Sequence, residues 1–213
     1  MSVSAEVLAD LVSRVHDGAA RLGAGRPAGP GVPVGPGCRL VVVDGPAGSG
    51  KTTLAAQLGE ALPAQVVHMD DLYEGWTGMT AGTGRLVEQV LGPLSQGRPG
   101  CYQRYDWTLG DFAEWHDVPL APFLVVEGCG AGARRIADLT TLLVWVEADD
   151  EIRLARGIAR DGDDAYDAWI DWMVSEREVY AVEGTAERAD VVLDGFGEPV
   201  LRPDRAAGGV ADV

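Results

Sequence analysis

The sequence predicts an α/β fold built on a doubly wound parallel sheet, and two observations carry this prediction. Short, wholly apolar segments alternate with segments of helical periodicity, as in successive βαβ units. A glycine-rich turn at residues 45–52 lies directly between the first apolar segment and a helical one. The length of 213 residues and the ordinary apolar content of 46% suit one folded domain with a modest appendage.

The chain divides into an N-terminal helix, a linker, a main domain and a tail. Within residues 1–22, apolar side chains recur at helical spacing, namely Val7, Leu8, Leu11, Val12 and Val15. Ten of the fifteen residues 23–37 are Gly or Pro, which is typical of an extended or mobile linker. We expect the main domain at 38–202 and a frayed tail at 203–213. The helix is expected to pack on the main domain, and a contact with another subunit is the alternative.

Five apolar segments of the main domain are predicted to be buried strands. They comprise residues 38–45, 64–70, 123–128, 141–149 and 189–195. Helical patterns occur at 51–62, 85–91, 150–160 and 165–182. The polar, Gly-rich residues 72–84 are expected to form a loop. Ligands of such sheets bind at the carboxyl ends of the strands, so we expect the functional residues there.

Net charge and cysteine content limit the partners and the compartment. The formal charge of -16 repels nucleic acid and anionic membranes, so neither is expected as a partner. Three widely spaced cysteines without a short metal-binding spacing argue against a disulfide framework. No signal peptide and no apolar run of about 20 residues is evident, so we expect a cytoplasmic protein.

The glycine-rich turn matches the phosphate-binding template G-x-x-x-x-G-K-[ST], with the strand and helix that the template requires on either side. Glycines let backbone N–H groups surround phosphate oxygens, and the following helix adds the positive end of its dipole. Lys51 is the only lysine beside sixteen arginines, and its compact charge suits the β- and γ-phosphates in a narrow loop. Thr52 is expected to hold Mg²⁺. The predicted nucleotide-binding residues are Gly45, Pro46, Ala47, Gly48, Ser49, Gly50, Lys51, Thr52 and Thr53.

Carboxylates follow the next two strands. Asp70 and Asp71 come directly after the second predicted strand, and Glu127 lies at the tip of the third. Near Mg²⁺, a carboxylate orients an alcohol and accepts its proton during phosphoryl transfer. Asp71 is the alternative base, and a solvated turn or a helix N-cap is the alternative role of the pair. His68, inside the second strand, is expected to be structural. ATP is the expected nucleotide, since no N-K-x-D element for guanine is present.

The phosphate loop, the D-x-[FLY]-Y motif at 70–73 and the apolar-E-G motif that ends at 128 together resemble the uridine kinase and phosphoribulokinase group of P-loop kinases. The resemblance covers residues 38–195. It implies a P-loop NTPase fold of the nucleoside and nucleotide kinase type with a helical lid. It also implies that Asp70 faces the acceptor hydroxyl as catalytic base, and that Glu127, Thr52 and Asp70 form the metal site.

Arg153, Arg156 and Arg160 recur at three- and four-residue spacing, so they share one face of the predicted helix 150–160. In the resembling kinases such a helix leads into a lid whose arginines contact the nucleotide phosphates, and Arg156 and Arg160 are the best matches. Their implied catalytic role, beside Lys51, is to neutralise charge that grows on the bridging oxygen. An exposed basic face paired with nearby acids is the alternative, and it accounts for Arg153 fully.

Aromatic and acidic side chains mark the predicted acceptor site. Tyr105, Asp106 and Trp107 form a Y-D-[FW] element that resembles the segment of uridine kinases near the base and sugar of the nucleoside. The two aromatic rings are expected to stack on a flat ring, and the carboxylate is expected to bind hydroxyls. Tyr73 and Trp76 are expected to approach from the other side. Packing is the alternative role of Trp107, and it is the expected role of Trp145, Trp169 and Trp172.

These features predict a kinase that transfers the γ-phosphoryl group of ATP to a hydroxyl of a small molecule, foremost a nucleoside. Residues 75–91 depart from the uridine kinase pattern, so a sugar, an antibiotic or a vitamin precursor is the alternative acceptor. A nucleotide-dependent regulatory ATPase is the alternative class, supported by the linker and the leading helix. A homo-oligomer is left open.

Overall fold

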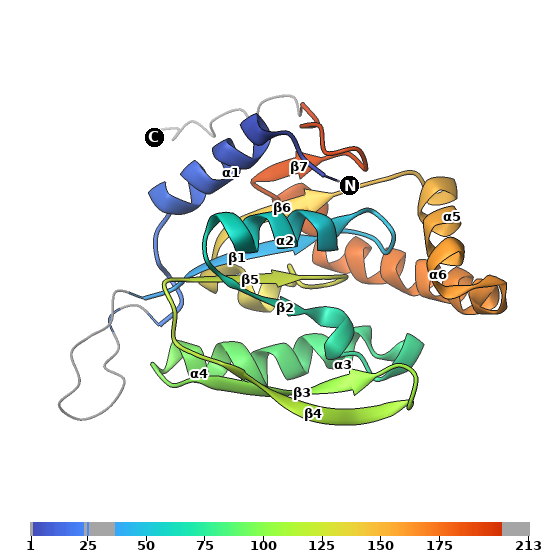
Figure 1. Ribbon diagram of the computed structural model, residues 1–213, viewed down its shortest axis with the longest axis horizontal. Helices are drawn as coiled ribbons and strands as arrows, with labels where there is room; N and C mark the ends of the chain where they lie inside the picture. Colours follow the sequence, from blue (N-terminus) through green and yellow to red (C-terminus); the bar gives the residue numbers. More distant parts are fainter. Residues whose placement is uncertain (1, 24, 26–36, 202–213) are drawn as a thin grey trace, which may run out of the picture.

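The computed structural model describes residues 2–23, 25 and 37–201. At its centre, five parallel strands form one sheet in the order β2-β5-β1-β6-β7 (Figure 1). The strands are β1 (Arg39–Asp44), β2 (Gln65–His68), β5 (Phe123–Glu127), β6 (Thr140–Val146) and β7 (Val191–Leu193). The doubly wound parallel sheet predicted from the alternating segments is therefore confirmed.

Alternate side chains of β1 point into two separate cores, one on each face of the sheet. Val41 and Val43 belong to the first core, which α1 (Ala5–Asp17) and α2 (Lys51–Ala61) cover. Leu40 and Val42 belong to the second core, on the opposite face. This core is completed by residues of α3 (Met79–Arg85), η3 (Leu86–Leu91), α4 (Gly92–Ser95), the hairpin of β3 (Gly100–Asp106) and β4 (Asp111–Val118), and α6 (Tyr166–Glu183). Burial of both faces explains why the strands are apolar throughout instead of alternating with polar residues.

The N-terminal helix α1 packs on the sheet as part of the first core. The Ser4 hydroxyl caps it by accepting a hydrogen bond from the Val7 N–H at 3.3 Å. Leu11 and Val15 are fully buried against that core. Packing on the main domain is thus the observed role of this helix. Most of the predicted linker 23–37 and all of the predicted tail 203–213 lie outside the described residues.

The segment expected to be a loop, 72–84, is largely helical, so that prediction is wrong. It contains η2 (Gly75–Thr77) and α3 (Met79–Arg85), which continues as the π-helix η3 (Leu86–Leu91) and α4 (Gly92–Ser95). A Cβ on Gly82 would lie 2.6 Å from the ring of Tyr73. The glycine that suggested a loop therefore permits close packing of a helix on an aromatic ring.

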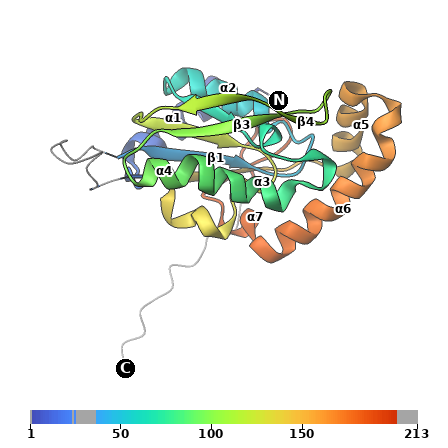
Figure 2. The same cartoon turned by 90° about the horizontal axis from the view of Figure 1, so that it is seen from below.

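A second sheet, which the sequence analysis did not predict, is the antiparallel hairpin of β3 (Gly100–Asp106) and β4 (Asp111–Val118). It lies along α3 and α4 at the side of the molecule away from α1 (Figures 1 and 2). Tyr102 and Val118 anchor it in the second core. Much of β4 is exposed, and the β3–β4 register shifts between Gln103 and Tyr105. Neither strand therefore has the continuous apolar pattern of the central sheet.

Two packed helices, α5 (Asp150–Asp161) and α6 (Tyr166–Glu183), stand at the carboxyl ends of the parallel strands (Figure 1). A Cβ on Gly157 would lie 2.3 Å from Trp169, so the two helices meet closely at this glycine. The shorter elements are η1 (Met69–Asp71), η4 (Arg134–Leu139), η5 (Asp163–Ala165) and α7 (Thr185–Arg188). Within the described ranges, no helix has both the length and the apolar character that a membrane span requires.

Candidate nucleotide and acceptor site

The phosphate loop lies between β1 and α2, as the sequence predicts. β1 ends at Asp44 and α2 begins at Lys51, so residues 45–50 form the turn. Gly48 has φ 77°, and a Cβ on it would lie 2.6 Å from the carbonyl oxygen of Arg153 in α5. Only glycine fits both the conformation and the space at this position. Close packing against α5 therefore fixes the path of the loop.

A cavity of about 640 Å³ opens in front of the loop, which is within the size range of ligand pockets. Its other walls come from η1, the β3–β4 hairpin, the end of β5, and the helices α5 and α6. Of the predicted loop residues, Ala47, Gly48, Gly50, Lys51 and Thr52 line the cavity. Gly45, Pro46, Ser49 and Thr53 do not line it.

Lys51 is 7% exposed and reaches the cavity from the first turn of α2. Its ammonium donates hydrogen bonds to the Pro46 carbonyl at 2.9 Å and to Cys129 Sγ at 3.6 Å. Burial by itself lowers the pKa of Lys51, but nearby acidic groups, Cys129 and Glu127 foremost, more than offset this, so its pKa is raised. Because burial raises the pKa of Cys129 to about 12, its thiol is neutral at pH 7. With this thiol neutral, Glu127 is the largest remaining contribution that raises the pKa of Lys51.

Thr52 and Glu127, predicted as metal ligands, lie in direct contact. The Thr52 hydroxyl donates a hydrogen bond to Glu127 Oε1 at 3.1 Å, and His68 Nδ1 lies 2.7 Å from the same oxygen. That contact is the largest cause that raises the pKa of His68. Mg²⁺ typically binds one or two carboxylates and completes its ligands with water and phosphate. Thr52, Glu127 and Asp70 fit such a site, although no cluster of three His, Cys, Asp or Glu exists within the described residues.

Asp70 lies in η1, directly after β2, and lines the cavity. No described residue donates a hydrogen bond to its carboxylate, whereas its main-chain carbonyl accepts one from the Trp107 indole at 2.9 Å. The side chain is open to the cavity, yet the surrounding walls partly desolvate it, and this effect together with the Glu127 charge raises the pKa of Asp70. The Asp71 carboxylate, by contrast, accepts a hydrogen bond from Tyr102 at 3.1 Å. The free carboxylate is therefore that of Asp70.

Indole rings wall the acceptor side of the cavity. Trp76 meets Trp107, Trp169 and Trp172 edge-on, with ring centroids 5.5, 6.1 and 6.1 Å apart. The Trp107 ring also lies edge-on to Tyr105 at 5.5 Å and remains 42% exposed. Trp76 thereby links the hairpin to α6. All of these side chains line the cavity, including Trp169 and Trp172, for which the sequence predicted only packing.

Two predicted acceptor residues have other roles in the structure. Tyr73 is 1% exposed, and its hydroxyl donates a hydrogen bond to the Cys129 carbonyl at 2.6 Å, so it is a fixed part of the wall. Asp106 does not line the cavity. Its carboxylate accepts hydrogen bonds from the Thr108 and Leu109 N–H groups and from Arg104. The interpretation of Asp106 as a ligand for acceptor hydroxyls is therefore wrong, because this carboxylate caps the hairpin turn.

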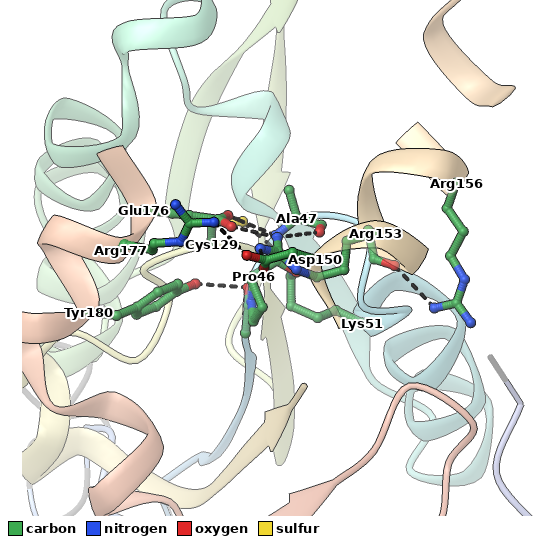
Figure 3. A network of polar contacts seen from close by, with 12 residues as sticks. Pro46, Ala47, Lys51, Cys129, Asp150, Arg153, Arg156, Glu176, Arg177 and Tyr180 are labelled. Atoms are coloured by element: carbon green, nitrogen blue, oxygen red, sulfur yellow. Dashed lines mark hydrogen bonds and ion pairs between the residues drawn. The ribbon is translucent and has the colours of Figure 1, made fainter. Parts of the chain in front are cut away.

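The three arginines of α5 have different surroundings. Arg153 is 2% exposed, so the interpretation as part of an exposed basic face is wrong. Arg156 lines the cavity, but its guanidinium donates hydrogen bonds to the carbonyls of Gly48 at 3.1 Å and Gly195 at 3.1 Å (Figure 3 shows its bond to the loop). Arg156 thus braces the phosphate loop.

Arg160, the other predicted lid residue, lines the cavity and keeps an exposed side chain. Its guanidinium pairs with Asp161 at 2.7 Å and lies 5.7 Å from the centroid of the Trp169 ring. It is also close enough to Asp70 to counteract the rise in the pKa of that carboxyl group. Arg160 is therefore the α5 arginine with a charge available to the cavity.

Asp44, a carboxylate behind the phosphate loop, was not predicted from the sequence as a functional residue. Asp44 is fully buried, and its oxygens accept hydrogen bonds from the N–H groups of Gly45 and Gly132, each at 2.7 Å. The Tyr180 hydroxyl lies 2.8 Å from both Asp44 Oδ1 and the Gly45 carbonyl and donates to one of them. Burial raises the pKa of Asp44 in spite of these hydrogen bonds. The sequence feature that could have identified Asp44 is a charged residue at the end of a wholly apolar strand.

A parallel sheet with a phosphate loop after β1, a carboxylate-lined cavity at its carboxyl edge and two helices beside it define a P-loop kinase. Residues 76–195, more than half of the 213-residue chain, match the model of the phosphoribulokinase / uridine kinase family, and residues 40–109 match the model of an AAA domain. The chain belongs to the phosphoribulokinase / uridine kinase family.

Solved structures with the same fold include a possible uridine kinase from Bacillus stearothermophilus, at 20% identity and a TM-score of 0.51. That match covers 86% of this chain and 98% of the other. A second, the YGR205w protein, is 16% identical with a TM-score of 0.53, covering 92% of this chain and 94% of the other. A search of curated protein sequences finds no match. At these identities the likeness shows the fold alone.

Proposed function

We propose that this protein transfers the γ-phosphoryl group of ATP to a hydroxyl group of a small molecule, foremost a nucleoside. The observation that carries the proposal is the unpaired Asp70 carboxylate, which lines the same cavity as Lys51 and the Thr52–Glu127 pair. A regulatory ATPase needs the phosphate loop and the metal ligands but has no use for a second free carboxylate on the acceptor side. The geometry therefore favours a kinase.

In the proposed reaction, the loop N–H groups and Lys51 hold the phosphates of ATP, and Asp70 holds the acceptor hydroxyl. Mg²⁺, when bound, would supply positive charge that neutralises the phosphate oxygens, and Thr52, Glu127 and, on the acceptor side, Asp70 are the residues that would hold it. Asp70 accepts the hydroxyl proton as the acceptor oxygen bonds to the γ-phosphorus, while the bond from that phosphorus to the bridging oxygen breaks and ADP leaves. Arg160 supplies a further positive charge next to this carboxylate.

The aromatic walls support a nucleoside as the acceptor. Trp76 and Trp107 offer indole surface beside Asp70, and such surface binds a flat heterocyclic ring. All three cysteines are free thiols, which supports a reducing, cytoplasmic compartment.

A ligand screen tests the proposal. Thermal shift is measured with Mg²⁺, a non-hydrolysable ATP analogue and a panel of nucleosides, sugars, antibiotics and vitamin precursors. Compounds that stabilise the protein are then assayed for ATP consumption, and the phosphorylated product is identified by mass spectrometry. We expect nucleosides to give both signals. Slow ATP hydrolysis without any phosphorylated product would instead identify a regulatory ATPase, and turnover with sugars alone would reject the nucleoside.

A further inference from the structure

A buried ion pair from the two flanking helices holds both peptide groups of Ala47 in the phosphate loop (Figure 3). Arg153 Nη1 donates a hydrogen bond to the Ala47 carbonyl at 2.9 Å, and the Ala47 N–H donates one to Glu176 Oε2 at 2.9 Å. The two side chains also pair with each other, with 2.5 Å between Arg153 Nη1 and Glu176 Oε1. They are 2% and 1% exposed. The pair thus binds the donor and the acceptor of a single loop residue.

An ion pair this deeply buried is poor evidence for a purely stabilising role. The attraction between two buried charges roughly compensates the cost of removing them from water, and apolar side chains of similar volume often stabilise a fold equally well. Apolar side chains, however, carry neither a donor nor an acceptor for the Ala47 peptide groups. The chemistry of Arg153 and Glu176 therefore matches the needs of the loop more closely than those of the core.

We propose that Arg153 and Glu176 are positioning residues that hold the phosphate loop in the conformation that binds the nucleotide. This inference rests on the proposed function, because it takes the loop to be a phosphate site. Both residues act through Ala47, which lines the cavity beside Gly48. A loop that is held in advance loses less conformational freedom on binding, and the affinity for phosphate is correspondingly higher.

Arg153 has a second effect, because Glu176 places a negative charge beside an anion site. Glu176 Oε2 lies 3.8 Å from Cys129 Sγ, which lies 3.6 Å from the ammonium of Lys51. A carboxylate so close to a triphosphate repels it unless a cation neutralises the charge. Removing Arg153 alone should therefore weaken nucleotide binding more than removing both members of the pair.

Isothermal titration calorimetry on the full chain, with Mg²⁺ and a non-hydrolysable ATP analogue, tests this proposal. We expect the Kd of the double variant Arg153→Met/Glu176→Met to rise about tenfold through loss of preorganisation, while its thermal midpoint stays near that of the wild type. Arg153→Met alone should raise the Kd by about a hundredfold, because the carboxylate is left uncompensated. The matched control is Arg177→Met. Arg177 follows Glu176 directly but is exposed, and its partner Asp150 keeps its ion pair with Arg153 when Arg177 is replaced, so the Kd of this variant should not change.

Two results would overturn the inference. One is a folded double variant that binds the analogue as tightly as the wild type, and the other is an Arg153→Met variant that binds no more weakly than the double variant. If the methionine variants do not fold, Glu176→Gln preserves the shape but loses one of the two acceptor oxygens. Its Kd should rise several-fold, and an unchanged value would also overturn the inference. Failure of the proposed function is distinguishable, because it shows as the absence of a phosphorylated product, whereas this inference concerns the affinity for nucleotide, which a regulatory ATPase would also have.

Discussion

The donor side and the acceptor side of the cavity are built differently. On the donor side, the phosphate loop is fixed from behind by Asp44, Arg153 and Glu176, all of which are buried. On the acceptor side, Asp70 has no hydrogen-bond donor to its carboxylate among the described residues, and Trp107 is 42% exposed. The structure thus combines a proposed phosphate site that buried side chains hold with a proposed acceptor site that is open.

This difference indicates where affinity and where selectivity arise. The triphosphate is the same whichever acceptor is used, and a loop held in advance binds it at low entropic cost. The acceptor has to reach Asp70 through an opening whose walls come from η1, the hairpin and α6. Substitutions on the donor side should therefore affect every acceptor equally, whereas those on the acceptor side should change the ranking of acceptors.

The largest effect is expected at Lys51. Lys51→Ala removes the one ammonium in the loop, and turnover should fall by at least about 10³-fold, since charge stabilisation is the main contribution to phosphoryl transfer. Lys51→Arg should be nearly as inactive, because a wide guanidinium does not fit a site where the lysine is 7% exposed. Steady-state ATP consumption with a saturating acceptor measures both. An active Lys51→Arg variant would contradict the argument from the size of the side chain.

Asp70→Asn should separate chemistry from binding. Loss of the base should lower kcat by about 10²- to 10⁴-fold, while the Kd of the ATP analogue stays within about twofold of the wild type. Asp71→Asn is the matched control, since the Asp71 carboxylate is tethered to Tyr102 outside the proposed reaction. Rapid-quench measurement of phosphorylated product gives the rate of transfer. If Asp71→Asn were the more damaging change, the base would have to be reassigned to Asp71.

The donor side could largely be predicted from the sequence, because most of its residues are contiguous in the chain. Strand, loop and helix are contiguous in residues 39–61, so the template that contains the loop glycines and Lys51 is found within this one stretch. Asp44 escaped prediction on this side, and so did Glu176, which lies 129 positions from the residue it binds, Ala47. No local pattern marks it, because α6 places it there through tertiary packing.

The acceptor side was harder to predict because its walls come from distant segments with mixed roles. Trp76 was correctly placed at the cavity, but glycines in 72–84 suggested a loop where the chain forms helices. Asp106 was chosen as a substrate ligand from its neighbours in sequence, whereas the hairpin turn uses its carboxylate. A polar residue next to aromatic residues in the sequence can either cap a turn or bind a ligand, and the sequence alone does not distinguish these two roles.

Trp107→Ala should act on the acceptor alone. Loss of one stacking ring typically costs about 1–3 kcal/mol per base, so the KM for a nucleoside should rise about 5- to 150-fold, while the KM for ATP should not change. Trp115→Ala is the matched control, because Trp115 lies on the same hairpin, is 61% exposed and does not line the cavity. Initial rates at varied acceptor and fixed ATP concentration measure the effect. Equal changes in both KM values would contradict the division into two sides.

The smallest expected effect concerns Arg104, a positively charged side chain on the acceptor side of the cavity. Arg104 lines the cavity, but its guanidinium is bound to Glu114 at 2.6 Å and to Asp106 at 2.9 Å. The hydrogen bond from Arg104 is the main reason that the pKa of Glu114 is lowered from 4.5 to about 2. The pair therefore stabilises the fold above pH 4.5 and loses this contribution as the pH falls toward 2. The contribution should be small because Glu114 is exposed.

NMR titration of the Glu114 carboxyl group shows whether Arg104 stays in this pair when the acceptor binds. In the free protein we expect a pKa of about 2, and Arg104→Gln should return it toward 4.5. A neutral nucleoside should leave the pKa unchanged, since it offers Arg104 no anion to replace Glu114. An acceptor that already carries a phosphate would draw Arg104 into the cavity and raise the pKa of Glu114. A rise on binding of the true acceptor would therefore exclude a neutral nucleoside and indicate that the acceptor side selects an anion.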